Sequence, residues 1–141
     1  DKVLILDNLN SINNNDPNFY INILETETDI NILNKALRII GSEVLYKDYN
    51  KTSLINNLEN IIRNSDSDFT TRRLGVFVLA VFLDEKPNDK VYTLFEKMVN
   101  GGDIDIFTRY LIIDIFNNYS LEKYELPLIS EEDWSLYYQN Y

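Results

Sequence analysis

Apolar side chains recur along most of the chain at the three-to-four-residue spacing of amphipathic α-helices. Two segments show the pattern best, 53–62 and 90–99. Their apolar positions are Leu54, Ile55, Leu58, Ile61 and Ile62 in the first, and Val91, Tyr92, Phe95, Met98 and Val99 in the second. This spacing places them on one helix face. Residues 16–24 form a weaker version, in which Pro17 suits a first helical turn after an Asp16 cap. Thr52 or Ser53, and Asp89, are the predicted caps of the other two helices.

Each of these helices is followed by a short polar turn and a second apolar segment. The pattern predicts second helices at about 30–46, 67–83 and 104–119. The run 74–83 is apolar almost all round, and its β-branched residues would also suit a buried strand. Its counterparts 37–40 and 111–114 are amphipathic, which favours a helix at all three places. A middle helix that neighbours cover on both sides needs an apolar surface all round.

Three segments of the chain match one another at a constant offset of 37 residues. The matched positions are Asp29, Asp66 and Asp103; Asn31, Asp68 and Asp105; Ile32, Phe69 and Ile106; Lys35, Arg72 and Arg109; Leu37, Leu74 and Leu111; and Ile39, Val76 and Ile113. Such a period indicates stacked two-helix repeats. We therefore predict one all-α domain, an α-α superhelix of about three to four helical hairpins. The repeats would span about 16–48, 53–84 and 89–120, with terminal caps at 1–12 and 121–141.

In each repeat an aspartate precedes a basic residue by six positions. The pairs are Asp29 with Lys35, Asp66 with Arg72, and Asp103 with Arg109. This arrangement resembles the HEAT-repeat family of right-handed helical solenoids, although the proline often found in that family's first helix is absent here. The resemblance implies that the turn aspartates and the second-helix bases form a structural ladder between neighbouring repeats. It also implies that each aspartate side chain lies against the turn or against a base of the next repeat.

The composition offers little catalytic chemistry. The chain has no cysteine and no histidine, so it lacks a thiolate nucleophile and the commonest general base near neutral pH. Its acidic clusters are Asp84-Glu85, Asp103-x-Asp105 and Glu131-Glu132-Asp133. All three fall at expected turns or helix starts, where the helix dipole favours acids. Phosphate-binding and nucleophile-elbow motifs are absent from the sequence. We expect no enzyme activity, no cofactor and no metal site.

The charge favours a basic protein as partner. The net charge is −10, and residues 84–141 carry −7 of it. This balance disfavours nucleic acid and attracts a positively charged protein surface. Apolar runs are too short to cross a membrane, and a secretory signal is not recognisable. A cytoplasmic protein is therefore expected. Because the chain does not begin with Met, we expect its start to be trimmed or incomplete. Its oligomeric state stays open.

Two groups of residues are candidate partner contacts. If Phe69 points inward, one side of the second helices points away from the core and would line a concave face. Its candidate contacts are Asp68, Thr71, Asp105, Thr108 and Ile112. The second group comes from the acidic, tyrosine-rich final third, where Tyr and Trp are common binding hot spots. It comprises Tyr110, Asp133, Tyr138 and Tyr141, for whose tyrosines a surface contact is nearly as good an explanation as packing. Trp134, Leu136 and Tyr137 are expected to close the core.

These features predict a non-catalytic protein-binding module. Its most concrete form is a bacterial immunity protein that neutralises a cognate toxin domain. Toxins that cut nucleic acid are often basic, so an acidic inhibitor would bind fast and cover their substrate surface. The alternative is a HEAT-like adaptor or assembly scaffold that binds a protein or peptide in its concave groove. A HEAT-like enzyme acting on DNA ranks last, because its binding face should be basic.

Overall fold

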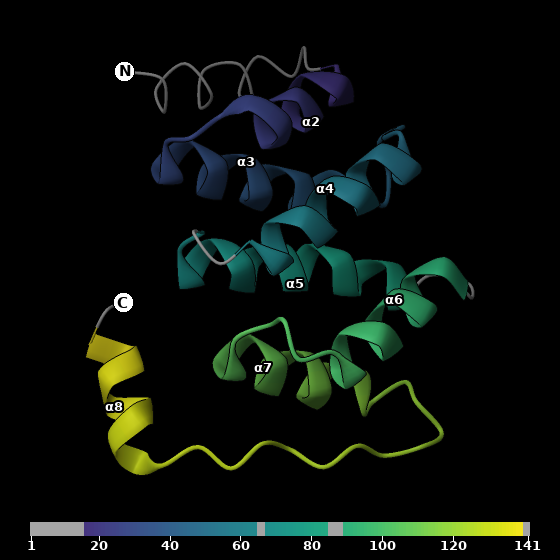
Figure 1. The fold of residues 1–141 in the computed structure, drawn as a ribbon. Coiled ribbons are helices and arrows are strands. Elements are labelled where there is room, and N and C mark those ends of the chain that lie inside the picture. The colour runs from purple at the N-terminus through teal and green to yellow at the C-terminus, as the bar shows by residue number, and fades with distance from the viewer. Residues whose placement is uncertain (1–15, 65–66, 85–88, 140–141) are drawn as a thin grey trace.

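A computed structural model describes residues 16–64, 67–84 and 89–139 of the chain. Within these ranges the chain forms seven α-helices and no strand (Figure 1). The helices are α2 (Pro17–Thr26), α3 (Ile30–Glu43), α4 (Lys51–Arg63), α5 (Phe69–Asp84), α6 (Asp89–Asn100), α7 (Ile106–Phe116) and α8 (Glu131–Gln139). The predicted all-α fold is confirmed for this part of the chain. The expected N-terminal cap, together with Asp66 and Tyr141, lies outside the described residues.

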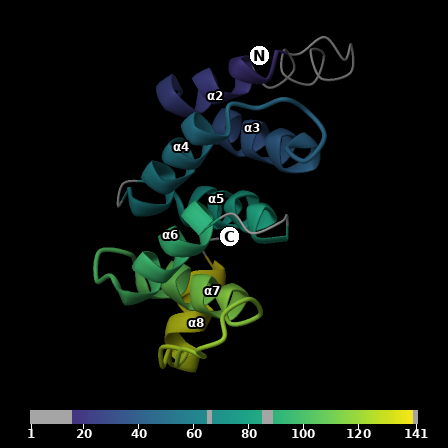
Figure 2. The same cartoon turned by 90° about the vertical axis from the view of Figure 1, so that its right-hand side faces the viewer.

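The helices alternate between two sides of the molecule. Figure 1 shows α3, α5 and α7 one below the other, with α2, α4 and α6 set beside them, and Figure 2 gives the view from the side. Helix α5 packs against α3, α4, α6 and α7. That central position explains why the run 74–83 is apolar almost all round, and it decides for a helix over a strand there. The side chains of Val76, Val78, Leu79 and Phe82 are all buried.

The 37-residue offset is visible in a direct contact between helices. The Thr71 hydroxyl of α5 donates a hydrogen bond to the Asn34 side-chain oxygen of α3, with 2.6 Å between the two oxygens. Both side chains are buried, and they occupy equivalent positions of successive repeats. Thr108, the next equivalent position, is buried in α7. Equivalent positions of α3 and α5 are therefore stacked on one another.

Helices α4 and α5 approach each other closely at Gly75. A Cβ atom added there would lie 3.3 Å from the Ile62 Cγ1 atom, tighter than ordinary van der Waals contact. Ile61 also lies against this spot, so glycine lets the two helices meet without a side chain between them. The close contact helps to set the orientation of α4, one wall of the cleft described below.

Polar side chains mark most helix starts. Asp16, followed by Pro17, caps α2 as predicted, because its carboxylate accepts a hydrogen bond from the Asn18 N–H. The predicted caps Thr52 and Ser53 are wrong for α4. Its cap is Asn50, whose side-chain oxygen accepts from the Ser53 N–H at 3.1 Å. An asparagine in extended conformation can satisfy that donor as well as serine does.

A buried polar cluster anchors the connection between α3 and α4. Glu43 at the end of α3 is 5% exposed. It accepts a hydrogen bond of 2.5 Å from the Tyr49 hydroxyl and pairs with the Lys47 ammonium at 2.9 Å. Burial, and then the hydrogen bond to Glu43, raise the pKa of the Tyr49 phenol well above its usual value. The connection is thereby tied back onto α3 just before α4 begins.

We predict that Thr71→Val lowers the free energy of unfolding by about 1–3 kcal/mol, because it leaves the buried Asn34 amide without its partner. Urea unfolding of wild-type and variant proteins measures the loss. The double variant Asn34→Leu/Thr71→Val should recover much of it, since both polar groups are then removed together. Additive losses in the double variant would contradict a coupled pair.

Candidate functional site

The chain after α7 carries the last helix back to the beginnings of α5 and α7. Residues 117–122 form a turn and a bend after α7, and residues 123–130 then run along α7 without helix or strand. Helix α8 follows and lies beside the starts of α5 and α7 (Figure 1). Asn117 fixes this path with its side-chain amide. Its nitrogen donates to the Tyr124 carbonyl and its oxygen accepts from the Tyr124 N–H, each at 2.9 Å.

Helix α8 is held by a group of stacked and edge-on rings, here called the aromatic cluster. Tyr137 stacks on Phe107 with ring centroids 4.6 Å apart. Trp134 meets Phe107 edge-on at 5.3 Å and Tyr110 at 5.2 Å. The cluster comprises Phe69 of α5, Phe107 and Tyr110 of α7, and Trp134, Tyr137 and Tyr138 of α8. Such ring pairs add attraction beyond their buried area.

The exposed residues of α8 include three acids and an aromatic side chain. None of its described residues is buried. The acids of its first turn, Glu131, Glu132 and Asp133, are exposed, and so is Tyr138, which is 63% exposed while its ring stacks on Trp134. These four exposed residues are here called the α8 surface. Ser130 caps this helix, because its hydroxyl oxygen accepts from the Asp133 N–H at 3.1 Å.

The expectation that α8 closes the core is wrong in part. Leu136 is 53% exposed, whereas Trp134 and Tyr137 are half-buried within the aromatic cluster. Burial raises the pKa of the Tyr137 phenol, and Arg73 opposes that rise through its charge and a hydrogen bond. Helix α8 is therefore positioned by its aromatic contacts with the starts of α5 and α7, and it does not insert into the core.

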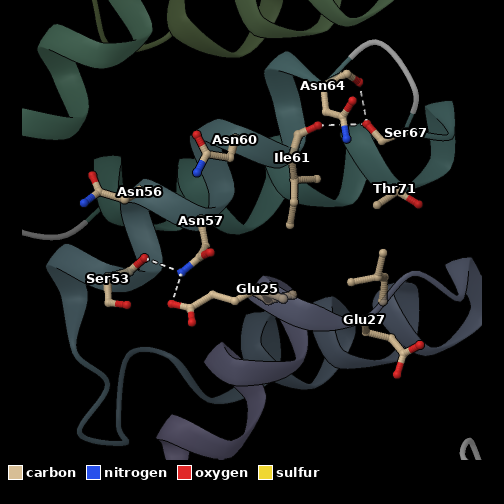
Figure 3. A pocket seen from close by; sticks show the side chains of 12 residues that line it. Glu25, Glu27, Ser53, Asn56, Asn57, Asn60, Ile61, Asn64, Ser67 and Thr71 are labelled. Carbon is tan, nitrogen blue, oxygen red and sulfur yellow. Dashed lines mark hydrogen bonds between the residues drawn. The ribbon is translucent and has the colours of Figure 1, made fainter.

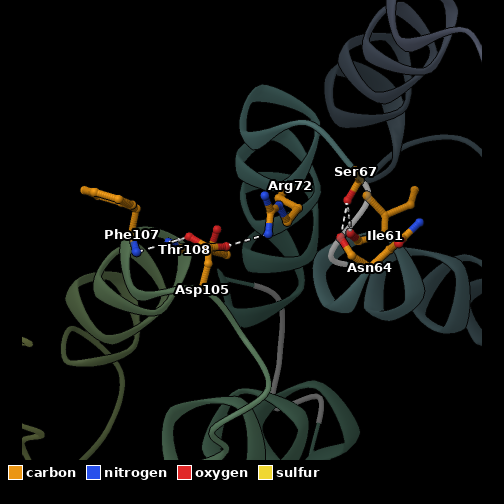
Figure 4. A network of polar contacts seen from close by, with 7 residues as sticks. All are labelled: Ile61, Asn64, Ser67, Arg72, Asp105, Phe107 and Thr108. Atoms are coloured by element: carbon orange, nitrogen blue, oxygen red, sulfur yellow. Dashed lines mark hydrogen bonds and ion pairs between the residues drawn. The ribbon is translucent and has the colours of Figure 1, made fainter. Parts of the chain in front are cut away.

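One ion pair connects α5 to α7 next to the aromatic cluster (Figure 4). The Arg72 guanidinium donates to Asp105 Oδ2 at 2.8 Å, and it lies over the Phe69 ring at 4.4 Å from the centroid. The other carboxylate oxygen of Asp105 accepts from the Phe107 and Thr108 N–H groups and so caps α7. Only 9% of the Arg72 side chain is exposed, so water screens this pair weakly.

The predicted aspartate–base ladder differs from the observed contacts. Asp29 caps α3 by accepting from the Asn31 N–H at 2.9 Å. Asp103 pairs with Arg63 of the preceding repeat at 2.6 Å, and hydrogen bonding to that guanidinium holds the pKa of the Asp103 carboxyl below its usual value. Arg109 instead donates to the Val99 carbonyl. Arg72, the predicted base of the second repeat, pairs with Asp105, which lies two positions after the predicted Asp103.

The predicted row of exposed partner contacts on the second helices is wrong at three of its five positions. Thr71 is 1% exposed, Thr108 is 5% exposed and Ile112 is fully buried. Asp68 and Asp105 are half-buried, and Asp105 already binds Arg72. The physical reason is that the side of α5 and α7 that carries these residues packs against neighbouring helices. From the second group, the structure places Tyr110 in the aromatic cluster, and Asp133 and Tyr138 on the α8 surface.

A polar cleft of about 600 Å³ opens between α2 and α4 (Figure 3), here called the amide cleft. Amides and hydroxyls of α4 form one wall, and two carboxylates near the end of α2 form the other. Its lining residues are Leu24, Glu25, Glu27, Leu33, Ser53, Asn56, Asn57, Asn60, Ile61, Asn64, Ser67 and Thr71. The Ser67 hydroxyl closes one end by donating to the Ile61 and Asn64 carbonyls (Figure 4). Sequence reasoning did not select the asparagines, although their four-residue spacing on the polar face of α4 was a usable signal.

A smaller cleft of about 370 Å³ lies between α4 and α6. It is lined by Ile55, Glu59, Lys90, Thr93, Leu94 and Lys97. Four of these residues are the 37-residue equivalents of Ser53, Asn56, Asn57 and Asn60 in the amide cleft. The same place in successive repeats therefore carries amides in one case and two lysines in the other.

The part of the chain that the structure describes contains no group of acidic side chains arranged to hold a metal ion. None of its described helices is long and apolar enough to cross a membrane. Comparison of the chain with protein-family models, curated proteins and solved structures gave no match. Function must therefore follow from the residues and geometry of this chain.

We predict that Asp105→Ala costs roughly 3 kcal/mol of unfolding free energy, because it removes a helix cap and unpairs the buried Arg72. Asp29→Ala is the matched control, since it removes a cap alone and should cost about 1 kcal/mol. Chemical denaturation of both variants gives the comparison. Equal losses would show that the Arg72–Asp105 pair adds nothing to the cap.

We predict that α8 detaches before the other helices unfold. Contacts between aromatic rings hold it in place, and none of its described residues is buried. Trp134 is the only tryptophan, so its fluorescence reports on this contact. Its urea midpoint should fall below the midpoint from far-ultraviolet circular dichroism. Phe107→Ala should lower the fluorescence midpoint further than it lowers the dichroism midpoint. Coincident transitions in the wild type would show one cooperative unit instead.

Proposed function

We propose that this protein is a non-catalytic module that binds a positively charged protein. The observation that carries the proposal is the α8 surface, where Glu131, Glu132 and Asp133 are exposed and the exposed Tyr138 ring follows them in the same helix, between one and two turns further on. Carboxylates accelerate encounter with a basic surface, and an aromatic anchor supplies contact area once the partners meet. The net charge of −10 acts in the same direction over the whole molecule.

In its most concrete form, the protein is an immunity protein for a basic, nuclease-like bacterial toxin domain. A toxin that cuts nucleic acid needs a basic surface to hold phosphates. An acidic protein that binds that surface blocks the substrate and competes with it for the same charges. The partially exposed aromatic cluster beside the α8 surface would then provide specificity that charge alone does not give.

We further propose that the helices form a HEAT-like right-handed superhelix. Support comes from the hydrogen bond between Asn34 and Thr71, which joins equivalent positions of two repeats. The adaptor alternative, with a groove along the second helices, is less well supported. Three of the side chains expected to line that groove, Thr71, Thr108 and Ile112, are buried.

The test is capture of the partner from extracts of the source cells on the immobilised protein, followed by association kinetics with the purified partner. Neutralising the α8 surface by Glu131→Gln, Glu132→Gln and Asp133→Asn should slow association about tenfold at low salt. The difference should shrink at high salt, because exposed charges are then screened. Binding of this protein at a concentration equal to that of the partner should also abolish the partner's toxic activity.

A charge-matched control separates the surface from the total charge. Neutralising three exposed acids elsewhere, Asp48→Asn, Glu96→Gln and Glu122→Gln, changes the net charge equally. This variant should associate nearly as fast as the wild type. Equal slowing by both triple variants would argue against a contact at α8. A captured partner that keeps its activity when bound would overturn the immunity function.

A further inference from the structure

We propose that the amide cleft between α2 and α4 binds an extended, lysine- or arginine-rich segment of the partner. The inference rests on the proposed protein-binding function but uses none of the residues of the α8 surface. It concerns a second contact, on the side of the molecule formed by the first helices of the repeats. The structure supports it through amide spacing, charge and the contrast between the two clefts.

The asparagines of α4 match the repeat of an extended peptide. Asn56 and Asn60 are four residues apart on the exposed side of the helix, which is about 6 Å along its axis. Every second residue of an extended chain advances by about 6.6 Å. Each amide carries both donors and an acceptor, so it can pair with the N–H and the C=O of a peptide backbone. Figure 3 shows both side chains at the wall of the cleft.

These amides are available for a ligand. Neither side chain of Asn56 or Asn60 makes a hydrogen bond with the described residues, and both are exposed. Asn57 differs, because it donates to the Ser53 carbonyl at 2.9 Å and to the Glu25 carboxylate at 3.1 Å. It therefore holds Glu25 in place opposite the two available amides.

The charge of the cleft selects a basic segment. Glu25 and Glu27 line it, whereas none of the described lining residues carries a positive charge. A carboxylate only accepts hydrogen bonds, so a ligand that satisfies Glu25 further must bring donors. Lysine and arginine side chains bring donors together with the opposite charge. Leu24, Leu33 and Ile61 add an apolar floor against which the stems of such side chains can pack.

The cleft between α4 and α6 occupies the equivalent position in the next repeat, and its charge is unfavourable for a basic ligand. Lys90 stands where the amide cleft has Ser53, and Lys97 stands where it has Asn60. Two ammonium groups would repel a basic peptide by like-charge juxtaposition. The cleft between α4 and α6 therefore serves as a natural comparison. The proposed segment would bind in the amide cleft and not in this one.

The test uses the full chain, labelled with ¹⁵N, and an octapeptide of alternating lysine and threonine. The side-chain amide signals of the labelled protein in two-dimensional NMR spectra report directly on Asn56, Asn57 and Asn60. The lysine peptide should shift these signals in a saturable and salt-dependent way. An octapeptide of alternating glutamate and threonine should leave them unchanged. No shift at about 5 mM peptide, equal shifts with both peptides, or shifts confined to α8 would each overturn the inference.

Matched variants then assign the site. Asn60→Lys imports the residue of the second cleft at an exposed position, and it should weaken peptide binding at least about tenfold. Lys97→Asn makes the reverse change one repeat away and should leave the shifts at Asn56 and Asn60 unaltered. Unchanged affinity of the Asn60→Lys protein, with its dichroism spectrum intact, would contradict binding in this cleft.

The two proposals fail in different ways. If the peptide does not bind while partner capture still depends on the α8 surface, the cleft inference is wrong and the protein-binding function stands. If the peptide binds at Asn56 and Asn60 but the captured protein ignores both surfaces, the proposed function is wrong as stated. Partner binding that is weakened by Asn60→Lys and by the α8 variant supports both.

Discussion

Burial of α5 between other helices is the constraint on which the rest of the structure depends. Two adjacent polar residues near its start, Thr71 and Arg72, point to different neighbours. Thr71 bonds to Asn34 of α3, whereas Arg72 pairs with Asp105 at the start of α7. Unpaired polar groups are costly in such a setting, so each contact fixes one register. Because the clefts between α2, α4 and α6 lie on the other side of this stack, their shape follows from the same registers.

The helices themselves could be predicted because periodicity records which positions a helix buries. The offset of 37 residues then decided the one ambiguous run, 74–83, in favour of a helix. Periodicity did not identify which side of the second helices faces the core. A helical wheel with Phe69 pointing into the core does not describe them, because Phe69 is half-buried against α8 and its equivalent Ile106 is 45% exposed. Such a wheel places Thr71 on the exposed side, whereas the structure buries it.

Pairing between repeats was also beyond the sequence alone. Equivalent positions identify which residues share a role, yet an ion pair depends on how far one helix is shifted along the next. The observed Arg72–Asp105 pair and the Arg63–Asp103 pair join positions that do not match at the repeat offset. The site at α8 was predicted in composition, through its acids and tyrosines. Its ring geometry was not, because it arises from contacts between segments far apart in the chain.

Repeats that share an interior can diverge freely on their surface, and in such a chain a specific binding site can arise where they diverge. Ile61 and its equivalent Met98 both remain apolar and buried, since both pack inside the molecule. Asn60 and its equivalent Lys97 lie on the exposed side, where no packing restricts them. A change from amide to ammonium there costs the fold little but adds a positive charge to the lining of the cleft. The amide cleft and the α8 surface both depart from the repeat. Matched residues such as Asp29 and Asp105 cap helices instead, and Ile39, Val76 and Ile113 are buried.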